Sequence, residues 1–407
     1  MLFLYKMQVL SSLLNIFSLR MLGTVIINHI AQRGVVNYAV NGLLNFFVKT
    51  DGDTGVKLIA GCFAVQAGYG SKTALDCAQN FTDSVFIRRA RQTIASLSAA
   101  GTLDKACFTQ LVNNLRSLGI RRRVAVVCPN DPHTEYVIIR SLREEIAEYL
   151  LVTDEAHVEI AHNLRAASPD FVRVYITSTP DEAAALAVEL VRTGEADILM
   201  KGLINTDNLL RAVLKKEKGL LPPGGVLSHV AVAQIPLYHK LLLFSDAAVI
   251  PRPGLLQFRA MIANDIAICR KLGNDQPRVA LIHCSEKVNE KFPHTLDYVQ
   301  LKEEAQLGRF GSVFVDGPMD AKTACDRHSG EIKGLSSPVI GNADIMIFPN
   351  IESGNTFYKT LSLFGDANMA GMLTGTIAPV VVPSRSDSGN SKFYSLALAC
   401  MAGNQND

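Results

Sequence analysis

The stretch Ala378–Ala402, APVVVPSRSDSGNSKFYSLALACMA, decides the fold. Within it, Pro379–Pro383 is a short apolar, β-branched run of the kind that forms a strand. The run from Phe393 to Cys400 has its apolar residues at helical spacing, and the hydroxyl-rich segment Ser384–Gly389 separates the two. The stretch therefore predicts a strand, a polar loop and a helix in that order.

The polar loop has the composition of an anion-binding site. In open α/β sheets, ligands bind outside the carboxyl ends of the strands. A helix that starts there offers free backbone N–H groups and the positive end of its dipole. Arg385 adds a guanidinium fork that fits phosphate bidentately, and the hydroxyl of Ser384 stands beside it. The loop therefore predicts a phosphate or oxyanion site.

Upstream of this stretch, from residue 108, short apolar runs alternate with amphipathic segments. The predicted strands are Val124–Cys128, Val172–Thr177, Ile198–Met200, Val230–Ile235, Leu241–Phe244, Ser245–Pro251, Val279–Cys284, Ser312–Val315 and Ile345–Phe348. The predicted helices are Glu135–Tyr149, Pro180–Thr193, Asp207–Lys216, Gln257–Leu272, Thr295–Gln306 and Thr356–Phe364. This alternation predicts an α/β fold with a mostly parallel sheet that is covered on both faces.

Polar residues follow many of the predicted strands. They are Lys201, Ser285, Asp316, Asn350, Glu352, Asn355, Ser384 and Arg385. Because ligands bind at the carboxyl ends of strands in this architecture, these residues predict a ligand site. Lys201-Gly202 is expected to hold a phosphoryl oxygen together with Thr206, which is predicted to cap the helix Asp207–Lys216.

The composition limits the classes of function. Apolar residues make up 48% and charged residues 19% of the 407 residues, as in a globular protein with a good core. A net charge of +2 gives no bulk attraction to nucleic acid or to anionic membranes. The eight cysteines are scattered and form no CxxC motif. They predict reduced thiols in a cytoplasmic protein, not a disulfide scaffold or a metal site.

Residues 1–107 differ from the remainder. Val9–Leu19 is an apolar run with the length of a signal-peptide hydrophobic region, but Arg20 interrupts it before it could span a bilayer comfortably. Three interpretations stay open: a weak membrane-surface anchor, a small helical appendage, or sequence upstream of the true start. Methionine is absent from Leu22 to Leu199, so a later start would need a different initiation codon.

From about residue 108 to 403, the sequence resembles the phosphate acetyl/butyryl transferase family, its butyryl branch most closely. The stretches that carry the resemblance are Ala196–Leu214, Leu227–Asp246, Glu286–Asp297, Asp316–Pro318, Pro349–Lys359 and Ser384–Lys392. The resemblance implies two α/β domains of the isocitrate/isopropylmalate dehydrogenase type, an active site in the cleft between them, and a homo-oligomer. We expect the first domain at 108–248 plus 375–407 and the second at 249–374, after an N-terminal extension of residues 1–107.

The reaction implied by the resemblance joins acyl-CoA and inorganic phosphate to give acyl phosphate and CoA. Phosphate would attack directly in a ternary complex, with no permanently bound cofactor and no metal. Butyryl is the expected acyl group and acetyl the alternative, and an acyl kinase would be the functional partner. A metal- and NAD-dependent dehydrogenase of the same fold would need a G-x-G-x-x-G loop after a strand, which the sequence lacks. A non-catalytic binding protein is the remaining alternative, and it would show no acyl-CoA turnover.

The resemblance also implies roles for individual residues. The acetyl branch has Ser-Arg at the place of Ser384-Arg385, and it has an Asp, proposed as a base, where this chain has Ser391. Asp387 is the nearest carboxylate and the substitute catalytic candidate. Arg192 stands at a position credited with binding CoA or phosphate. The other expected substrate-binding residues are Lys201, Gly202, Thr206, Asn350, Asn355 and Lys359. His229 is interpreted as a structural histidine.

Overall fold

The computed structural model describes residues 107–384 and 387–403. The chain divides into two compact units, residues 1–104 and 105–407, and every described residue belongs to the second. The interpretations given above for the N-terminal extension, and the position of Arg385, therefore lie outside the described residues. Within the described part, no helix combines the length and the apolar character needed to cross a membrane.

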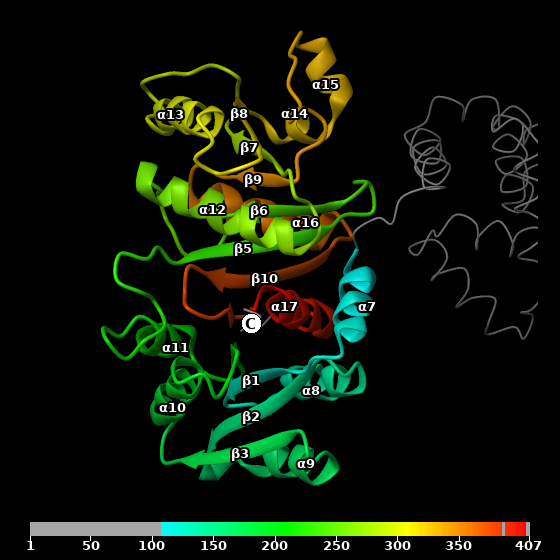
Figure 1. Cartoon of the computed structure of the whole chain (residues 1–407), viewed down its shortest axis with the longest axis vertical. Coiled ribbons are helices and arrows are strands. Elements are labelled where there is room, and N and C mark those ends of the chain that lie inside the picture. The colour runs from blue at the N-terminus through cyan, green and yellow to red at the C-terminus, as the bar shows by residue number, and fades with distance from the viewer. Residues whose placement is uncertain (1–106, 385–386, 404–407) are drawn as a thin grey trace, which may run out of the picture. The chain divides into compact units, whose positions relative to one another are not determined.

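Eleven strands of the second unit form one sheet in the order β3-β2-β1-β4-β11-β10-β5-β6-β9-β7-β8 (Figure 1). The strands are β1 Arg122–Val127, β2 Ala147–Asp154, β3 Val172–Thr177, β4 Ile198–Lys201, β5 Ser228–Gln234, β6 Leu241–Ser245, β7 Arg278–Ile282, β8 Phe314–Met319, β9 Ile345–Ile347, β10 Asn368–Thr374 and β11 Val380–Val381. The stretch Ala378–Ala402 thus supplies β11, near the centre of the sheet.

The strands at the two ends of the sheet run in opposite directions. The strands from β3 to β11 are all parallel to one another, and so are those from β6 to β8. Between them, β10 is antiparallel to β11 and to β5, and β5 is antiparallel to β6. Three reversals separate the two parallel groups, so their carboxyl ends leave the sheet at opposite edges.

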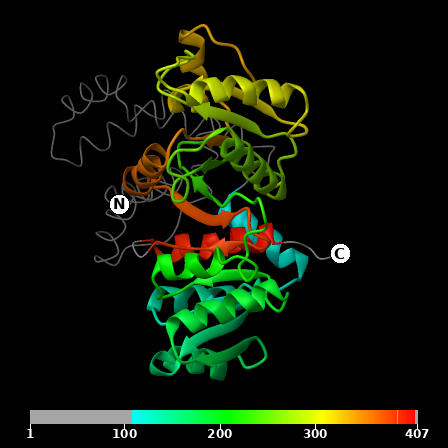
Figure 2. The same cartoon turned by 90° about the vertical axis from the view of Figure 1, so that its left-hand side faces the viewer.

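Helices cover both faces of the sheet. They are α7 Phe108–Leu118, α8 Pro132–Arg143, α9 Glu159–Ala167, α10 Pro180–Arg192, α11 Thr206–Val213, α12 Leu255–Lys271, α13 His294–Gln306, α14 Ala321–Cys325, α15 Arg327–Ile332, α16 Ile351–Phe364 and α17 Gly389–Ala402. A large core joins α7, α8, α12 and α17 on one face. Two smaller cores lie on the other, one beneath α10 and α11 and one beneath α16, and α12 and α16 lie on opposite sides of the sheet in Figure 2.

The predicted fold class, an α/β protein with a mostly parallel sheet, is confirmed. The helix predicted over Glu135–Tyr149 is wrong in its second half, because α8 ends at Arg143 and β2 begins at Ala147. Glu145 makes the reversal with a φ of 61°, a left-handed conformation that usually favours glycine. No glycine or proline marks this break, so the helical pattern of the sequence continues into the buried strand that follows.

Three smaller predictions need correction. Ser245–Pro251 is not a strand, because the Asp246 carboxylate accepts the backbone N–H groups of Ala248 and Val249, both at 2.7 Å, and bends the chain. The helix predicted from Thr356 begins at Ile351, with Asn350 as its cap. Asn205, and not Thr206, is the residue that precedes α11. The domain boundaries near residues 248 and 374 fall within one continuous sheet and stay a prediction.

Candidate active site

The loop after β11 is a closed turn. The backbone N–H of Ser384 donates to Oδ2 of Asp387 at 2.8 Å, and the backbone N–H of Asp387 donates to the Ser384 carbonyl at 3.2 Å. Two of the three predicted catalytic residues, Ser384 and Asp387, therefore close one turn, and the third, Arg385, stands between them in the sequence but lies outside the described residues. Ser388 caps α17 directly afterwards by accepting the N–H of Ser391.

The start of α17 is tied to α8. The Asn390 side chain accepts from Arg140 at 2.8 Å and from the Tyr136 hydroxyl at 3.2 Å. The buried Lys392 ammonium lies 3.7 Å from the Asp131 carboxylate, which caps α8. Burial opposes ionisation of Asp131, but hydrogen bonds from Thr134 and the charge of Lys392 outweigh it and lower the pKa of this carboxyl. These contacts fix the helix that carries the loop.

Lys201 and Gly202 lie beside this loop at the same edge of the sheet. Met200 of β4 pairs with Val381 of β11, so the two chains leave the sheet together. Lys201 is buried, with its ammonium donating to the Gly202 carbonyl at 3.3 Å. A Cβ on Gly202 would lie 2.2 Å from the carbonyl oxygen of Cys128, so only glycine allows this turn to pack on the end of β1.

α16 brings side chains of the other half of the sheet to the loop. It starts at the carboxyl end of β9 and runs back across the face on which His229 lies. Burial, followed by the negative charge of Asp387, raises the pKa of the Tyr358 hydroxyl. The ammonium of the exposed Lys359 lies 4.9 Å from the centre of the Tyr358 ring. Asp387 and Lys359 both act electrostatically on His229, so the structure brings these two predicted residues together.

His229, predicted to be a structural histidine, lies at the centre of this cluster. Its ring lies 6.5 Å from that of Tyr358, edge to face. Burial lowers the pKa of His229, the charges of Asp246 and Asp387 oppose this, and the charge of Lys359 adds to it. The imidazole is therefore neutral near pH 7, and its Nδ1 is buried with no hydrogen-bond partner.

Three of the predicted site residues lie at the opposite edge of the sheet, and two of them make a structural hydrogen bond. Asn350 accepts the N–H of Ser353 as the cap of α16, and the Asn355 amide donates to the Ala247 carbonyl at 2.9 Å. Both stand at the edge where β6 and β9 end. Arg192 is exposed at the end of α10, which leads into the amino end of β4, opposite Lys201. Thr206 begins α11. The expected single group at the strand ends thus divides between two edges.

A buried polar network lies behind His229. Ser245 Oγ is 2.9 Å from the His229 carbonyl oxygen and 2.8 Å from Oδ1 of Asp265, whose side chain is fully buried. A hydroxyl has one proton, so Ser245 donates to the carbonyl only if a protonated Asp265 donates to Ser245. This agrees with the pKa of Asp265, which burial raises well above its usual value. The network fixes the backbone of His229.

Replacing Asp265 with asparagine, which resembles the protonated acid, is expected to remove a pH dependence of stability. Because the pKa of Asp265 is raised in the folded state, the contribution of this residue to stability is fully present below its unfolded-state pKa. This contribution falls by about 1.4 kcal/mol per pH unit as pH rises toward the folded-state pKa. Asp265→Asn should therefore be increasingly more stable than wild type from pH 5 to pH 8 in urea unfolding. A stability difference that does not change with pH would contradict this, and the exposed Asp170→Asn is the control.

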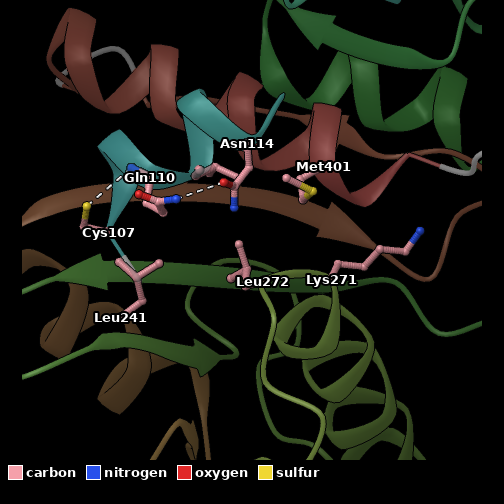
Figure 3. A pocket seen from close by; sticks show the side chains of 8 residues that line it. Cys107, Gln110, Asn114, Leu241, Lys271, Leu272 and Met401 are labelled. Carbon is pink, nitrogen blue, oxygen red and sulfur yellow. Dashed lines mark hydrogen bonds between the residues drawn. The ribbon is translucent and has the colours of Figure 1, made fainter. Parts of the chain in front are cut away.

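A separate pocket opens between α7, α12 and α17 (Figure 3). It is lined by Cys107, Gln110, Leu111, Asn114, Leu241, Lys271, Leu272 and Met401. The Gln110 amide donates to Asn114 at 3.0 Å. Lys271 is the lone charged residue of this lining, so the pocket offers no paired acid and base. Among the described residues, no group of three or more His, Cys, Asp or Glu side chains could hold a metal ion.

Comparison with known proteins gives one consistent family. Residues 171–400 match the family model described as phosphate acetyl/butaryl transferase. The chain is 37% identical over 301 residues to a phosphate butyryltransferase of Clostridium acetobutylicum, covering 73% of this chain and 99% of that relative. It is 35% identical over 293 residues to a phosphate acetyltransferase of Thermotoga maritima, covering 72% of this chain and 98% of that one.

Solved structures agree with the sequence matches. A branched-chain phosphotransacylase from Enterococcus faecalis superposes with a TM-score of 0.61 at 31% sequence identity. The match covers 69% of this chain and 98% of that chain.

Proposed function

Because the chain belongs to the phosphate acetyl/butyryl transferase family, we propose that it transfers a butyryl group between CoA and inorganic phosphate. Family membership supports phosphate acyltransferase chemistry, with acyl-CoA and phosphate as substrates, and leaves the dehydrogenase and the non-catalytic alternatives without support. The observation that carries the proposal is the closed Ser384–Asp387 turn, placed beside Lys201 and facing His229 and Lys359.

Each group of the turn has a proposed part in the reaction. The Arg385 guanidinium binds the phosphate that attacks the thioester carbonyl, since its fork matches two phosphate oxygens. The Ser384 hydroxyl donates to the developing oxyanion or to the departing sulfur. Lys201 and Lys359 add positive charge for phosphate groups. Asp387 shapes the turn, because one of its oxygens already accepts the Ser384 N–H.

The length of the acyl chain can be tested directly. A methylene group buried in a fitting pocket contributes about 0.8 kcal/mol, roughly a fourfold change in kcat/KM. We expect kcat/KM for phosphate-dependent release of free thiol to rise from acetyl-CoA to butyryl-CoA by roughly 15-fold over two methylenes. Acyl-CoAs from C2 to C5 are compared at fixed phosphate, without nucleotide or metal. A maximum at acetyl-CoA would favour the acetyl alternative.

The remaining expectations belong to the same proposal. Acyl phosphate is a reactive anhydride, so an acyl kinase is the proposed consumer of the product, and the cytoplasm is the proposed location. A homo-oligomer is the proposed assembly. Size-exclusion chromatography with light scattering tests the assembly, and a monomer at assay concentration would contradict it.

A further inference from the structure

Nδ1 of His229 is one of two buried side-chain nitrogen or oxygen atoms without a hydrogen-bond partner among the described residues, the other being Oδ2 of Asp265. The Asp265 oxygen lies in the core, whereas His229 faces the loop that carries Ser384 and Asp387. A buried polar atom left without a partner costs about 1–3 kcal/mol. A protein keeps such an atom beside a substrate-binding loop when the partner is the substrate.

The imidazole is held firmly in this position. The backbone N–H of His229 donates to Oδ2 of Asp246 at 2.9 Å, and its carbonyl accepts from Ser245 at 2.9 Å. Across the neighbouring strand, Gly371 leaves room for the ring, since a Cβ there would lie 2.8 Å from Nε2. The Gly371 N–H is in turn bound to Ser395 of α17 at 3.0 Å. The His229 ring is therefore connected through Gly371 to α17, the helix that follows the loop.

The groups around the ring keep it neutral. Asp246 follows β6, Asp387 lies in the loop before α17, and Tyr358 and Lys359 project from α16. β10 contributes Gly371, which has no charge. Burial of the ring and the Lys359 charge act against protonation, and the two carboxylates do not overcome them. A neutral imidazole has one nitrogen able to accept a proton.

The reaction needs such an acceptor. Monohydrogen phosphate has a proton on oxygen, and CoA leaves as a thiolate that must gain one. When the phosphate oxygen bonds to the acyl carbon and the C–S bond breaks, that proton has to pass from phosphate to sulfur. The acetyl branch is expected to have a carboxylate for this step where this chain has Ser391, whose hydroxyl accepts from Ser388 and cannot serve as a base at neutral pH.

We propose, on the premise of the phosphate acyltransferase function above, that His229 is the catalytic base of this chain. Its imidazole accepts the proton of the attacking phosphate and donates the same proton to the sulfur of CoA. The ring is neutral before and after each turnover, so no further acid, base or co-reactant is needed.

The test is His229→Gln, which keeps a hydrogen-bonding side chain of similar size and removes the proton transfer. We expect kcat for phosphate-dependent thiol release to fall about 100-fold, with KM for phosphate changed little. The ratio of wild-type to variant kcat should shrink only at acidic pH, well below the usual histidine range, because burial lowers the pKa of His229 and delays protonation of the wild-type imidazole. Ionisation of phosphate affects both enzymes and cancels in this ratio. The matched control is His239→Gln, at the exposed turn between β5 and β6.

Chemical rescue separates catalysis from structure. Added imidazole should restore activity to His229→Ala and leave wild type unchanged, whereas a structural histidine would not be replaced by free imidazole. Should the His229 variants fail to fold, Gly371→Ala provides a second test, because it displaces the ring and keeps the histidine; a kcat at least tenfold lower is expected.

The outcomes are distinguishable. Wild type without phosphate-dependent turnover of any acyl-CoA overturns the proposed function. An active wild type overturns only the role of His229 if His229→Gln retains kcat within twofold across the pH range, if imidazole fails to rescue a folded His229→Ala, or if Gly371→Ala keeps wild-type kcat.

Discussion

Replacing Arg385 with alanine is expected to lower kcat/KM for phosphate-dependent release of thiol from butyryl-CoA by about 100- to 1,000-fold, the usual loss when a donor to transition-state charge is removed. The residue stands between Ser384 and Asp387, whose hydrogen bonds close the turn at the end of β11. No side-chain contact of Arg385 is needed for those bonds, so the variant should fold normally. Thiol release is followed spectrophotometrically at several phosphate concentrations.

Two further variants sharpen this experiment. Arg385→Lys keeps the positive charge and loses the planar fork, so an intermediate activity with a raised KM for phosphate is expected. Arg165→Ala removes an exposed arginine from α9 and should behave as wild type. Retention of more than a third of wild-type kcat/KM by Arg385→Ala would refute the role proposed for the guanidinium.

Replacing Gly354 with alanine is expected to abolish most of the activity and to lower the melting temperature. In an exposed helix this substitution would stabilise by about 1 kcal/mol through helix propensity. Here a Cβ would lie 2.1 Å from the carbonyl oxygen of Asp246, and backbone cannot yield as a flexible side chain does. The clash should cost about 3 kcal/mol, typical of severe overpacking, so the substitution should lower the stability of the protein despite the gain in helix propensity.

The loss of activity follows from the position of α16. The helix has to move away from Asp246, and Tyr358 and Lys359 move with it, away from His229 and Asp387. Thermal unfolding and acyl-CoA turnover measure both effects. Thr360→Ala, on the exposed side of the same helix, should be at least as stable as wild type and fully active. A Gly354→Ala protein as stable as wild type would show that α16 tolerates the shift.

Much of the fold could be predicted because its elements have local signals. The strand Val172–Thr177 was predicted with the bounds that it has, and Pro180 and Thr179 mark the start of α10 as first residue and cap. The family resemblance is confirmed by relatives of 37% and 35% identity. The strand β2 was missed because Glu145, at a φ of 61°, supplies a reversal that local composition does not reveal.

The candidate site was less accessible to prediction because it depends on pairing between distant strands. Lys201 and Asn350 both follow strands, but whether two strand ends meet is decided by three antiparallel pairs at the centre of the sheet. His229 gave a weak signal, since its sequence neighbours are those of a core strand. Its importance comes from the missing partner of Nδ1 and from Asp387, which lies far away in the sequence.

Because the strand direction reverses across the sheet, the length of α16 determines how far its side chains extend toward the loop after β11. Tyr358 and Lys359 reach the loop after β11 along this helix, beyond its close approach to Asp246 at Gly354. Each helical residue advances about 1.5 Å and turns about 100°, so the interval from Gly354 to Lys359 sets both reach and orientation. Designers who alter this enzyme can lengthen the far end of α16, but must leave that interval unchanged.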